Sequence, residues 1–156
     1  MVSQIHLLLH NIRSTHNVGA IFRTADAVGV KKIYISGYTP APIDRFGRAR
    51  SDISKASLGA ENTVEWENIS DVKKLIKSLK KEKFNIVGIE QDKRSIDFRK
   101  SKVKGNVLVI VGNEVDGIDK DTLDLCDHIL EIPMLGQKES LNVSVATGIV
   151  LYSLID

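Results

Sequence analysis

The chain has 156 residues, a length typical of one domain, and its 42% hydrophobic and 27% charged residues are enough for a folded core. No run approaches the ~18 consecutive apolar residues of a membrane span, and frequent apolar residues with a net charge of only +2 exclude extended disorder. A single cysteine, Cys126, excludes a disulfide framework and a thiolate-rich zinc site. The first ten residues lack the features of a signal peptide, so we expect a cytoplasmic protein with no membrane partner.

The charges are unevenly distributed along the chain. Residues 1–106 carry 20 Lys and Arg against 11 Asp and Glu, whereas residues 107–156 carry 2 against 9. A basic part beside an acidic part indicates one face for a polyanion such as a nucleic acid. The alternative is two solvated faces of opposite charge.

Short apolar runs predict strands at residues 5–9, 31–36, 63–66, 84–89, 107–111 and 128–132. Amphipathic spacing predicts helices over residues 19–29, 70–83, 119–125 and 140–152. Asn17, Ser70 and Ser140 are placed to cap three of them, and the last helix is expected to turn Leu141, Val145, Ile149 and Tyr152 inward. Strands that alternate with helices predict an α/β domain, with a mainly parallel sheet flanked by helices.

Three polar segments follow predicted strands, at residues 11–17, 112–117 and 134–142. In parallel sheets, ligands bind beyond the carboxyl ends of the strands. We therefore predict that the fold brings these segments together.

Several common sites are absent from the sequence. No two of the 11 glycines are separated by a single residue, so the dinucleotide-binding G-x-G-x-x-G turn is missing, and no Walker A sequence occurs. The four histidines show no metal-ligand spacing, so no metal site is expected. His6, His10 and Cys126 are interpreted as structural residues.

The first polar segment leads into a helix whose second turn carries Arg23, where a cation opposes the helix macrodipole. This placement indicates either a functional residue or a surface arginine paired with Asp26 or another acid. In the second segment, Gly112 allows close approach to the backbone at the end of a central strand, and Glu114 follows at the rim of the sheet. An ordinary turn is the alternative there. The third segment predicts either a capped helix and nothing more, or a functional residue in Asn142, whose side-chain amide would be free.

Together the segments resemble the SpoU (TrmH-like) family of RNA ribose 2'-O-methyltransferases, within the SPOUT superfamily. The matching motifs are N-x-x-x-x-x-N-x-G-A-x-x-R-T-A-D-A from Asn11, G-N-E-x-x-G-I from Gly112, and I-P-M-x-G-x-x-x-S-L-N-V-S-V-A from Ile132. The resemblance implies one SPOUT domain over residues 1–156, with a C-terminal trefoil knot over about residues 107–156. It also implies a homodimer and S-adenosylmethionine as the cofactor, held in the knot.

The resemblance also implies roles for individual residues. Gly112, Ile132 and Leu141 would contact the cofactor through their backbone, Met134 would wall its adenine, and Ile89 is a further candidate. Arg23 matches the catalytic arginine of the family. Because a guanidinium has a pKa above ~12, we prefer it as a phosphate clamp and alkoxide stabiliser to a base.

Four further motif positions would orient Arg23 and the ribose and hold the loops, and these are Asn17, Glu114, Ser140 and Asn142. Because the family site is built across the dimer, Arg23 is expected to act on cofactor held by the other subunit.

The resemblance makes RNA the expected partner, and a compact dimer favours tRNA over rRNA. The arginines expected to contact it are Arg13, Arg45, Arg48 and Arg50. The lysines of the helix at 70–83 either join these arginines or form a solvated face.

Two other hypotheses about function stay open, namely a non-catalytic RNA-binding knotted dimer and a methyltransferase that acts on a base.

Overall fold

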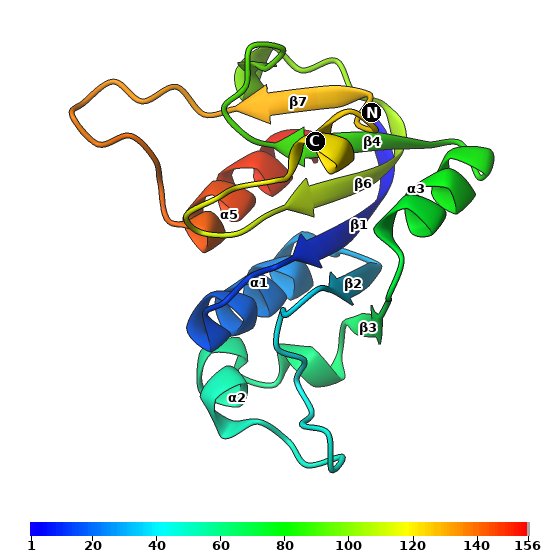
Figure 1. Cartoon of the computed structure of the whole chain (residues 1–156), viewed down its shortest axis with the longest axis vertical. Helices are drawn as coiled ribbons and strands as arrows, with labels where there is room; N and C mark the ends of the chain where they lie inside the picture. Colours follow the sequence, from blue (N-terminus) through cyan, green and yellow to red (C-terminus); the bar gives the residue numbers. More distant parts are fainter. Residues whose placement is uncertain (156) are drawn as a thin grey trace.

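The computed structural model describes residues 1–155, and Asp156, the last residue of the expected domain, lies outside them. Its centre is one seven-stranded sheet in the order β3-β2-β1-β6-β4-β7-β5, and every paired strand runs parallel to its neighbour (Figure 1). The strands are β1 (Val2–His10), β2 (Lys32–Ser36), β3 (Glu65–Asn68), β4 (Phe84–Ile89), β5 (Ile96–Asp97), β6 (Gly105–Val111) and β7 (His128–Glu131). The predicted α/β class is confirmed.

Helices cover both faces of this sheet. They are α1 (Thr15–Val28), α2 (Ser51–Ser57), α3 (Val72–Lys81), α4 (Lys120–Leu123) and α5 (Val143–Leu154), with two 3₁₀ turns, η1 (Ala60–Asn62) and η2 (Phe98–Lys100). Buried residues of α1 and α5 belong to one hydrophobic cluster, and those of α3 and α4 to a second. The sheet therefore separates two cores.

The central strand β6 shows why the sheet is covered on both sides. Its side chains alternate between the two clusters, with Val109 in the first and Leu108 and Ile110 in the second. All three are fully buried. Successive side chains of a strand point to opposite faces, so a strand that is apolar at every position needs a layer on each side.

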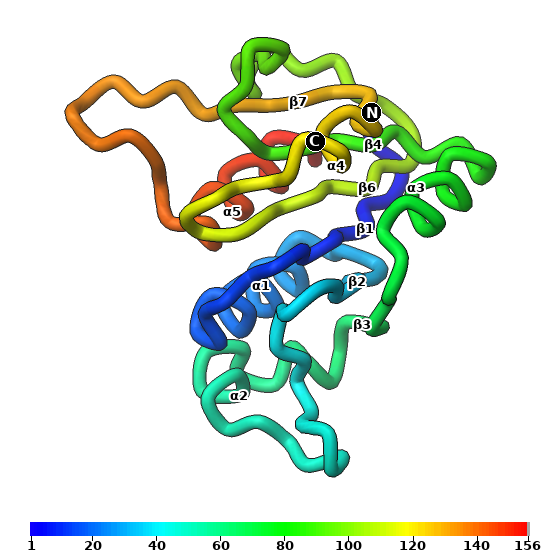
Figure 2. Tube along the Cα trace, viewed as in Figure 1, coloured from blue at the N-terminus to red at the C-terminus, as the bar shows by residue number. Residues whose placement is uncertain are grey.

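The carboxyl ends of β1, β4, β6 and β7 lie at one edge of the sheet, because these neighbouring strands run parallel to one another. Strand β6 pairs with both β1 and β4, although it follows both in the sequence. Figure 2 shows the segments after β1, β6 and β7 turning at this same edge, where α1 and α5 begin. The polar segments that follow these strands therefore have a common location.

Three predicted helix caps are wrong by one to three residues. The Ser14 hydroxyl accepts from the Asn17 N–H at 3.1 Å, so Ser14 caps α1 and Asn17 lies in its first turn. Asp71 caps α3 in place of Ser70, and Asn142 caps α5 in place of Ser140. In each case neighbouring polar residues could all serve as caps, and the sequence did not distinguish them.

The predicted inward face of α5 is also wrong. Leu141, Val145 and Tyr152 are 38%, 50% and 54% exposed. The buried residues of the helix are Thr147, Val150, Leu151 and Leu154. Since α5 is apolar on almost every side, its periodicity could not identify the side that meets the sheet.

Smaller differences concern the first half of the chain. Strand β3 begins two residues later than predicted, and α2 and the short β5 were not predicted. Helix α2 packs directly on α1, where a Cβ on Gly19 would lie 2.6 Å from the Ile53 carbonyl oxygen. Within residues 1–155, no helix is both long and apolar enough to cross a bilayer.

Candidate functional site

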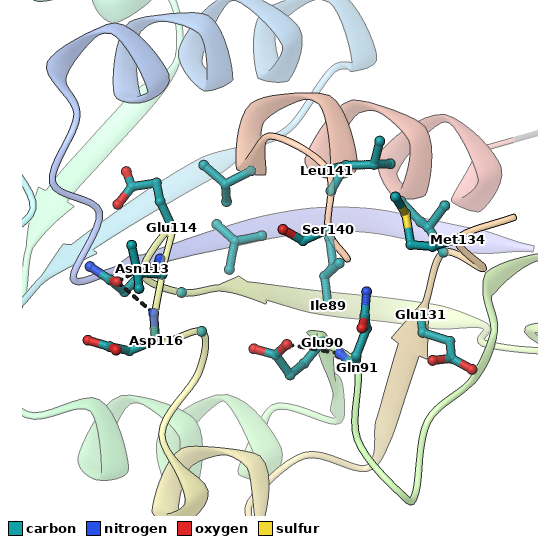
Figure 3. Close-up of a pocket in the computed structure, with 17 residues that line it drawn as sticks. Ile89, Glu90, Gln91, Asn113, Glu114, Asp116, Glu131, Met134, Ser140 and Leu141 are labelled. Carbon is teal, nitrogen blue, oxygen red and sulfur yellow. Dashed lines mark hydrogen bonds between the residues drawn. The ribbon is translucent and has the colours of Figure 1, made fainter. Parts of the chain in front are cut away.

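A pocket opens where β4, β6 and β7 end (Figure 3). Its wall is formed by residues that follow these strands and by the start of α5. The lining residues are Ile89, Glu90, Gln91, Val111, Gly112, Asn113, Glu114, Val115, Asp116, Gly117, Glu131, Ile132, Met134, Ser140, Leu141, Val143 and Ala146. All five predicted cofactor contacts, Ile89, Gly112, Ile132, Met134 and Leu141, lie in this wall.

Glu114 joins the end of β6 to the start of α1. Its carboxylate accepts hydrogen bonds from the Arg13 and Ser14 N–H groups at 3.1 and 3.2 Å, and from Asn17 Nδ2 at 3.3 Å. Burial raises the pKa of Glu114, but these hydrogen bonds outweigh it and hold the pKa below its ordinary value. Glu114 is therefore an ionised anchor at a helix N-terminus.

Asn17 and Asn142 extend this connection to α5. Asn142 Nδ2 donates to Asn17 Oδ1 at 3.1 Å, while Asn142 Oδ1 accepts from the N–H groups of Ser144 and Val145. Asn17 is only 6% exposed. We call Glu114, Asn17 and Asn142 the amide–carboxylate chain. It confirms that residues 11–17, 112–117 and 134–142 converge.

The structure gives a second reason for a glycine at position 112, besides the close approach of a ligand that the sequence predicted. A Cβ on Gly112 would lie 2.6 Å from the Gly117 carbonyl carbon and oxygen. Asn113 Oδ1 closes the turn by accepting from the Val115 and Asp116 N–H groups at 2.9 and 2.8 Å. The glycine is thus required by the turn itself, and the same turn presents its backbone to the pocket.

Glu90 and Gln91 belong to the site and were not predicted. Glu90 Oε2 accepts from the Ile118 N–H at 2.8 Å, and Gln91 Nε2 donates to the Glu139 carbonyl at 2.7 Å. Both residues directly follow Ile89, at the end of β4. The rule that ligands bind beyond parallel strand ends could have identified them.

The wall of the pocket is acidic at its polar positions. Among residues 1–155 it contains Glu90, Glu114, Asp116 and Glu131, no Lys or Arg, and apolar side chains that include Ile89. Such a wall suits an apolar or aromatic group that carries a positive charge, and it disfavours a phosphate. Among residues 1–155, no three His, Cys, Asp or Glu side chains are grouped as metal ligands.

Arg23 and Ser140 stand apart from the amide–carboxylate chain. Ser140 lines the pocket, but Arg23 does not. Arg23 is exposed on α1, six residues after Asn17 and so about 9 Å along the helix axis. Asp26 accepts from Thr63 Oγ1, and no ion pair between Arg23 and Asp26 occurs within residues 1–155. The part of the chain that the structure describes offers Arg23 no hydrogen bond or ion pair.

The predicted RNA-binding arginines lie in two places. Arg13 is exposed beside the site, where its N–H binds Glu114. Arg45, Arg48 and Arg50 lie in the loop between β2 and α2, where Arg48 pairs with Asp44 and Arg50 with the first turn of α2. The lysines of α3 are exposed.

His6 and Cys126 have structural surroundings. The His6 ring lies 4.8 Å from that of Phe84, and burial lowers its pKa. Burial also raises the pKa of the Cys126 thiol to about 12, so the thiol stays protonated and unreactive.

Comparison with known proteins identifies the family. The model of the SpoU rRNA Methylase family matches residues 4–152. The 23S rRNA (guanosine-2'-O-)-methyltransferase RlmB of Vibrio vulnificus is 32% identical over 153 residues, which cover 98% of this chain and 59% of that protein. The chain spans between 55% and 59% of the length of such curated relatives.

Solved structures share the fold. The A. aeolicus TrmH/SpoU tRNA modifying enzyme is 30% identical with a TM-score of 0.84, covering 97% of this chain and 73% of that one. The AdoMet-bound rRNA methyltransferase of Sinorhizobium meliloti is 26% identical with a TM-score of 0.86, covering 97% and 56%. The resemblance inferred from the three motifs is confirmed, and this chain belongs to the SpoU rRNA Methylase family.

Proposed function

We propose that this chain transfers a methyl group from S-adenosylmethionine to a ribose 2'-hydroxyl of RNA. The observation that carries the proposal is the amide–carboxylate chain, which joins residues from all three motifs beside one pocket. The curated relatives are named for 2'-O-methylation of RNA, which supports the same reaction.

The pocket fits the proposed cofactor. S-adenosylmethionine, when bound, supplies a methyl group on a positively charged sulfur. Glu90 and Glu131 provide negative charge in the wall, and Met134 and Ile89 provide apolar surface for an aromatic ring. Gly112, Ile132 and Leu141 would contribute backbone contacts. No basic residue in the described part of the wall opposes the positive charge.

We assign Arg23 to the RNA side of the reaction. Its guanidinium has no acidic partner in the described chain, so it is available to a phosphate and to a developing ribose oxyanion. Asn17 and Asn142 would hold α1, and therefore Arg23, in a fixed position relative to the pocket. Ser140, in the pocket wall, would contact the ribose or the cofactor.

Ribosomal RNA is the substrate that we propose, in place of the tRNA favoured by the sequence. The tRNA expectation rested on compact size alone, whereas the curated relatives are named for 23S rRNA. The A. aeolicus protein is named as a tRNA modifying enzyme, and this keeps tRNA as the second candidate. A location in the cytoplasm, where both RNAs are modified, belongs to this proposal.

A homodimer completes the proposal. Exposed apolar side chains occur along and next to α5 and on the segments that follow β6 and β7, and these are Val115, Leu135, Leu141, Val145, Tyr152 and Ile155. A partner subunit that covers these side chains would remove their apolar surface from water. Helix α1 packs against α5, so the same partner would lie near Arg23. The trefoil knot over residues 107–156 is proposed on the resemblance, within one domain.

Methyl transfer to two transcripts tests this function. Purified protein with labelled S-adenosylmethionine is expected to methylate 23S rRNA in preference to tRNA, and nuclease digestion should place the label on ribose. Arg23→Ala should reduce the rate at least about 100-fold while calorimetry shows unchanged cofactor binding. Arg99→Ala, which removes an exposed arginine paired with Asp97, is the matched control and should keep full activity.

The other readings give different results. A non-catalytic RNA-binding dimer would bind no S-adenosylmethionine in the same calorimeter. A base methyltransferase would leave the label on the base after digestion. Full activity of Arg23→Ala would refute the role assigned to Arg23.

A further inference from the structure

An aromatic ring projects from the loop between β2 and α2. Phe46 is 67% exposed and belongs to neither hydrophobic cluster. In Figure 1 this cyan loop extends beyond the sheet at the lower end of the molecule. A large apolar side chain at such a position contributes nothing to the core.

Two arginines lie against this ring. The Arg45 and Arg48 guanidinium carbons are 4.8 and 5.0 Å from the centroid of the Phe46 ring, which is cation–π distance. Asp44 pairs with Arg48, whereas Arg45 has no acidic partner within residues 1–155. We call Arg45, Phe46 and Arg48 the arginine–phenylalanine tip.

The backbone under the tip is held in one conformation. Asp44 Oδ1 accepts from the Phe46 and Arg48 N–H groups at 2.8 and 3.0 Å, and the Gly47 N–H donates to the Asp44 carbonyl at 3.0 Å. Gly47 has a φ of +76°, which this tight turn requires. The backbone that carries the ring is therefore held before RNA binds, which lowers the entropy cost of binding.

The tip is also connected to the helix that carries Arg23. The Arg50 N–H donates to the Pro42 carbonyl at 2.9 Å, and the Arg50 carbonyl accepts from Ser54 at the start of α2. Helix α2 in turn packs against α1 at Gly19. A ligand on the tip is thus placed relative to Arg23 through packed helices.

We propose that the arginine–phenylalanine tip binds an unpaired base of the RNA substrate by stacking. Bases of single-stranded RNA stack on aromatic rings and on guanidinium planes, and phosphates attract the same arginines. A duplex keeps its bases stacked inside and cannot use the ring. The inference rests on the proposed function and deepens it, because it names a single-stranded region of the RNA substrate as a contact.

Binding of a labelled single-stranded oligoribonucleotide of about 12 nucleotides tests the tip, with a blunt duplex of the same sequence as the second probe. Phe46→Ala and Phe46→Leu should each weaken single-strand binding by about 5-fold or more. Phe46→Trp should bind as well as the original chain, and single-strand RNA should quench the fluorescence of its added indole. Duplex binding should be unchanged in all three variants.

Leu58→Ala is the matched control, since Leu58 is a 65% exposed apolar residue at the end of α2. It should bind both probes like the original chain. Normal single-strand binding by Phe46→Leu would overturn the proposal, because apolar bulk would then suffice. Normal single-strand binding by Phe46→Ala would overturn it as well, because the ring would then contribute nothing. Equal loss on both probes would also overturn it.

Methyl-transfer assays separate this inference from the proposed function. If the chain methylates RNA and Phe46→Ala leaves KM unchanged, the tip is not a substrate contact and the inference fails. If the chain shows Phe46-dependent single-strand binding and no methyl transfer, the tip stands and the proposed reaction fails.

Discussion

Asn142 donates a hydrogen bond from Nδ2 to Oδ1 of Asn17 at 3.1 Å, across 125 residues of sequence. The same Asn142 side chain caps α5 through its Oδ1. Asn17 passes the connection on to Glu114. One amide therefore stabilises a helix terminus and also fixes the position of α1 relative to the pocket.

Replacing Asn142 should affect stability and function together. Asn142→Ala removes the cap of α5, and we expect a loss of about 0.5–2 kcal/mol in the free energy of unfolding, measured by urea titration. It also removes the hydrogen bond that joins the first turn of α1 to the start of α5 beside the pocket. We therefore expect weaker binding of S-adenosylmethionine by calorimetry, in the same protein.

Asp71→Ala is the control for this effect. Asp71 caps α3 through the Lys74 N–H at 3.0 Å, on the other face of the sheet. It should lose a similar amount of stability and keep the original cofactor affinity. Equal loss of affinity in both variants would show that any destabilisation lowers binding, and that the amide–carboxylate chain has no special role.

Glu114 should make stability depend on pH. The folded protein holds its pKa below the ordinary 4.5, so the folded state binds this proton less tightly than the unfolded chain. The stability that Glu114 contributes is fully present above pH 4.5 and is lost as pH falls through the lowered pKa. Glu114→Gln should therefore be less stable near neutral pH, and the difference should shrink in acid.

Unfolding by urea at several pH values measures this dependence. Glu82→Gln is the control, because Glu82 is exposed at the end of α3 and its side chain makes no hydrogen bond in the described chain. It should follow the original profile. A constant difference between Glu114→Gln and the original chain from pH 7 to pH 3 would contradict the assignment.

Gly112 should tolerate no side chain. In Gly112→Ala the new Cβ would lie 2.6 Å from the Gly117 backbone, and the turn after β6 would have to open. We expect a loss of about 1–3 kcal/mol in the free energy of unfolding. Gly136→Ala is the matched control, since its Cβ would meet nothing within 4 Å. A stable Gly112→Ala with an intact pocket would contradict this account of the turn.

The sheet and the meeting of the three polar segments were predictable because they depend on local patterns. Strand β6 is apolar at consecutive positions, and such a strand must be covered twice. The ends of parallel strands then meet at one edge. The motifs identified Gly112, Glu114 and Asn142, because their residue types and separations are specific to a family.

The face of α5 could not be predicted, for a physical reason. Val145 and Val150 are equally apolar, yet Val145 is 50% exposed and Val150 is fully buried. Hydrophobic periodicity assumes that water covers one side of a helix. Where a partner subunit is proposed to cover that side, both sides of the helix are apolar and the periodicity cannot distinguish them.

Glu90 was missed because one carboxylate after a strand carries no motif.

Arg23 should act on the pocket of the other subunit, since it does not line the pocket of its own chain. Two variants test this when mixed. Arg23→Ala keeps an intact pocket, whereas Ala146→Phe fills the pocket and keeps Arg23. Each alone should be inactive in methyl transfer. After unfolding and refolding together in equal amounts, half of the dimers are hybrids with one complete site, so activity should return to about a quarter of the original.

The mixture separates the two arrangements. If Arg23 served its own pocket, neither subunit of the hybrid would hold a complete site, and the refolded mixture would stay inactive. Mixing without unfolding is the control and should show no recovery of activity while subunits do not exchange.

Val145→Glu tests the dimer itself, because a charge on the exposed face of α5 should weaken the dimer, as measured by light scattering, and lower the methyl-transfer activity with it. Ile43→Glu, at a 42% exposed residue outside α5, should leave the dimer intact.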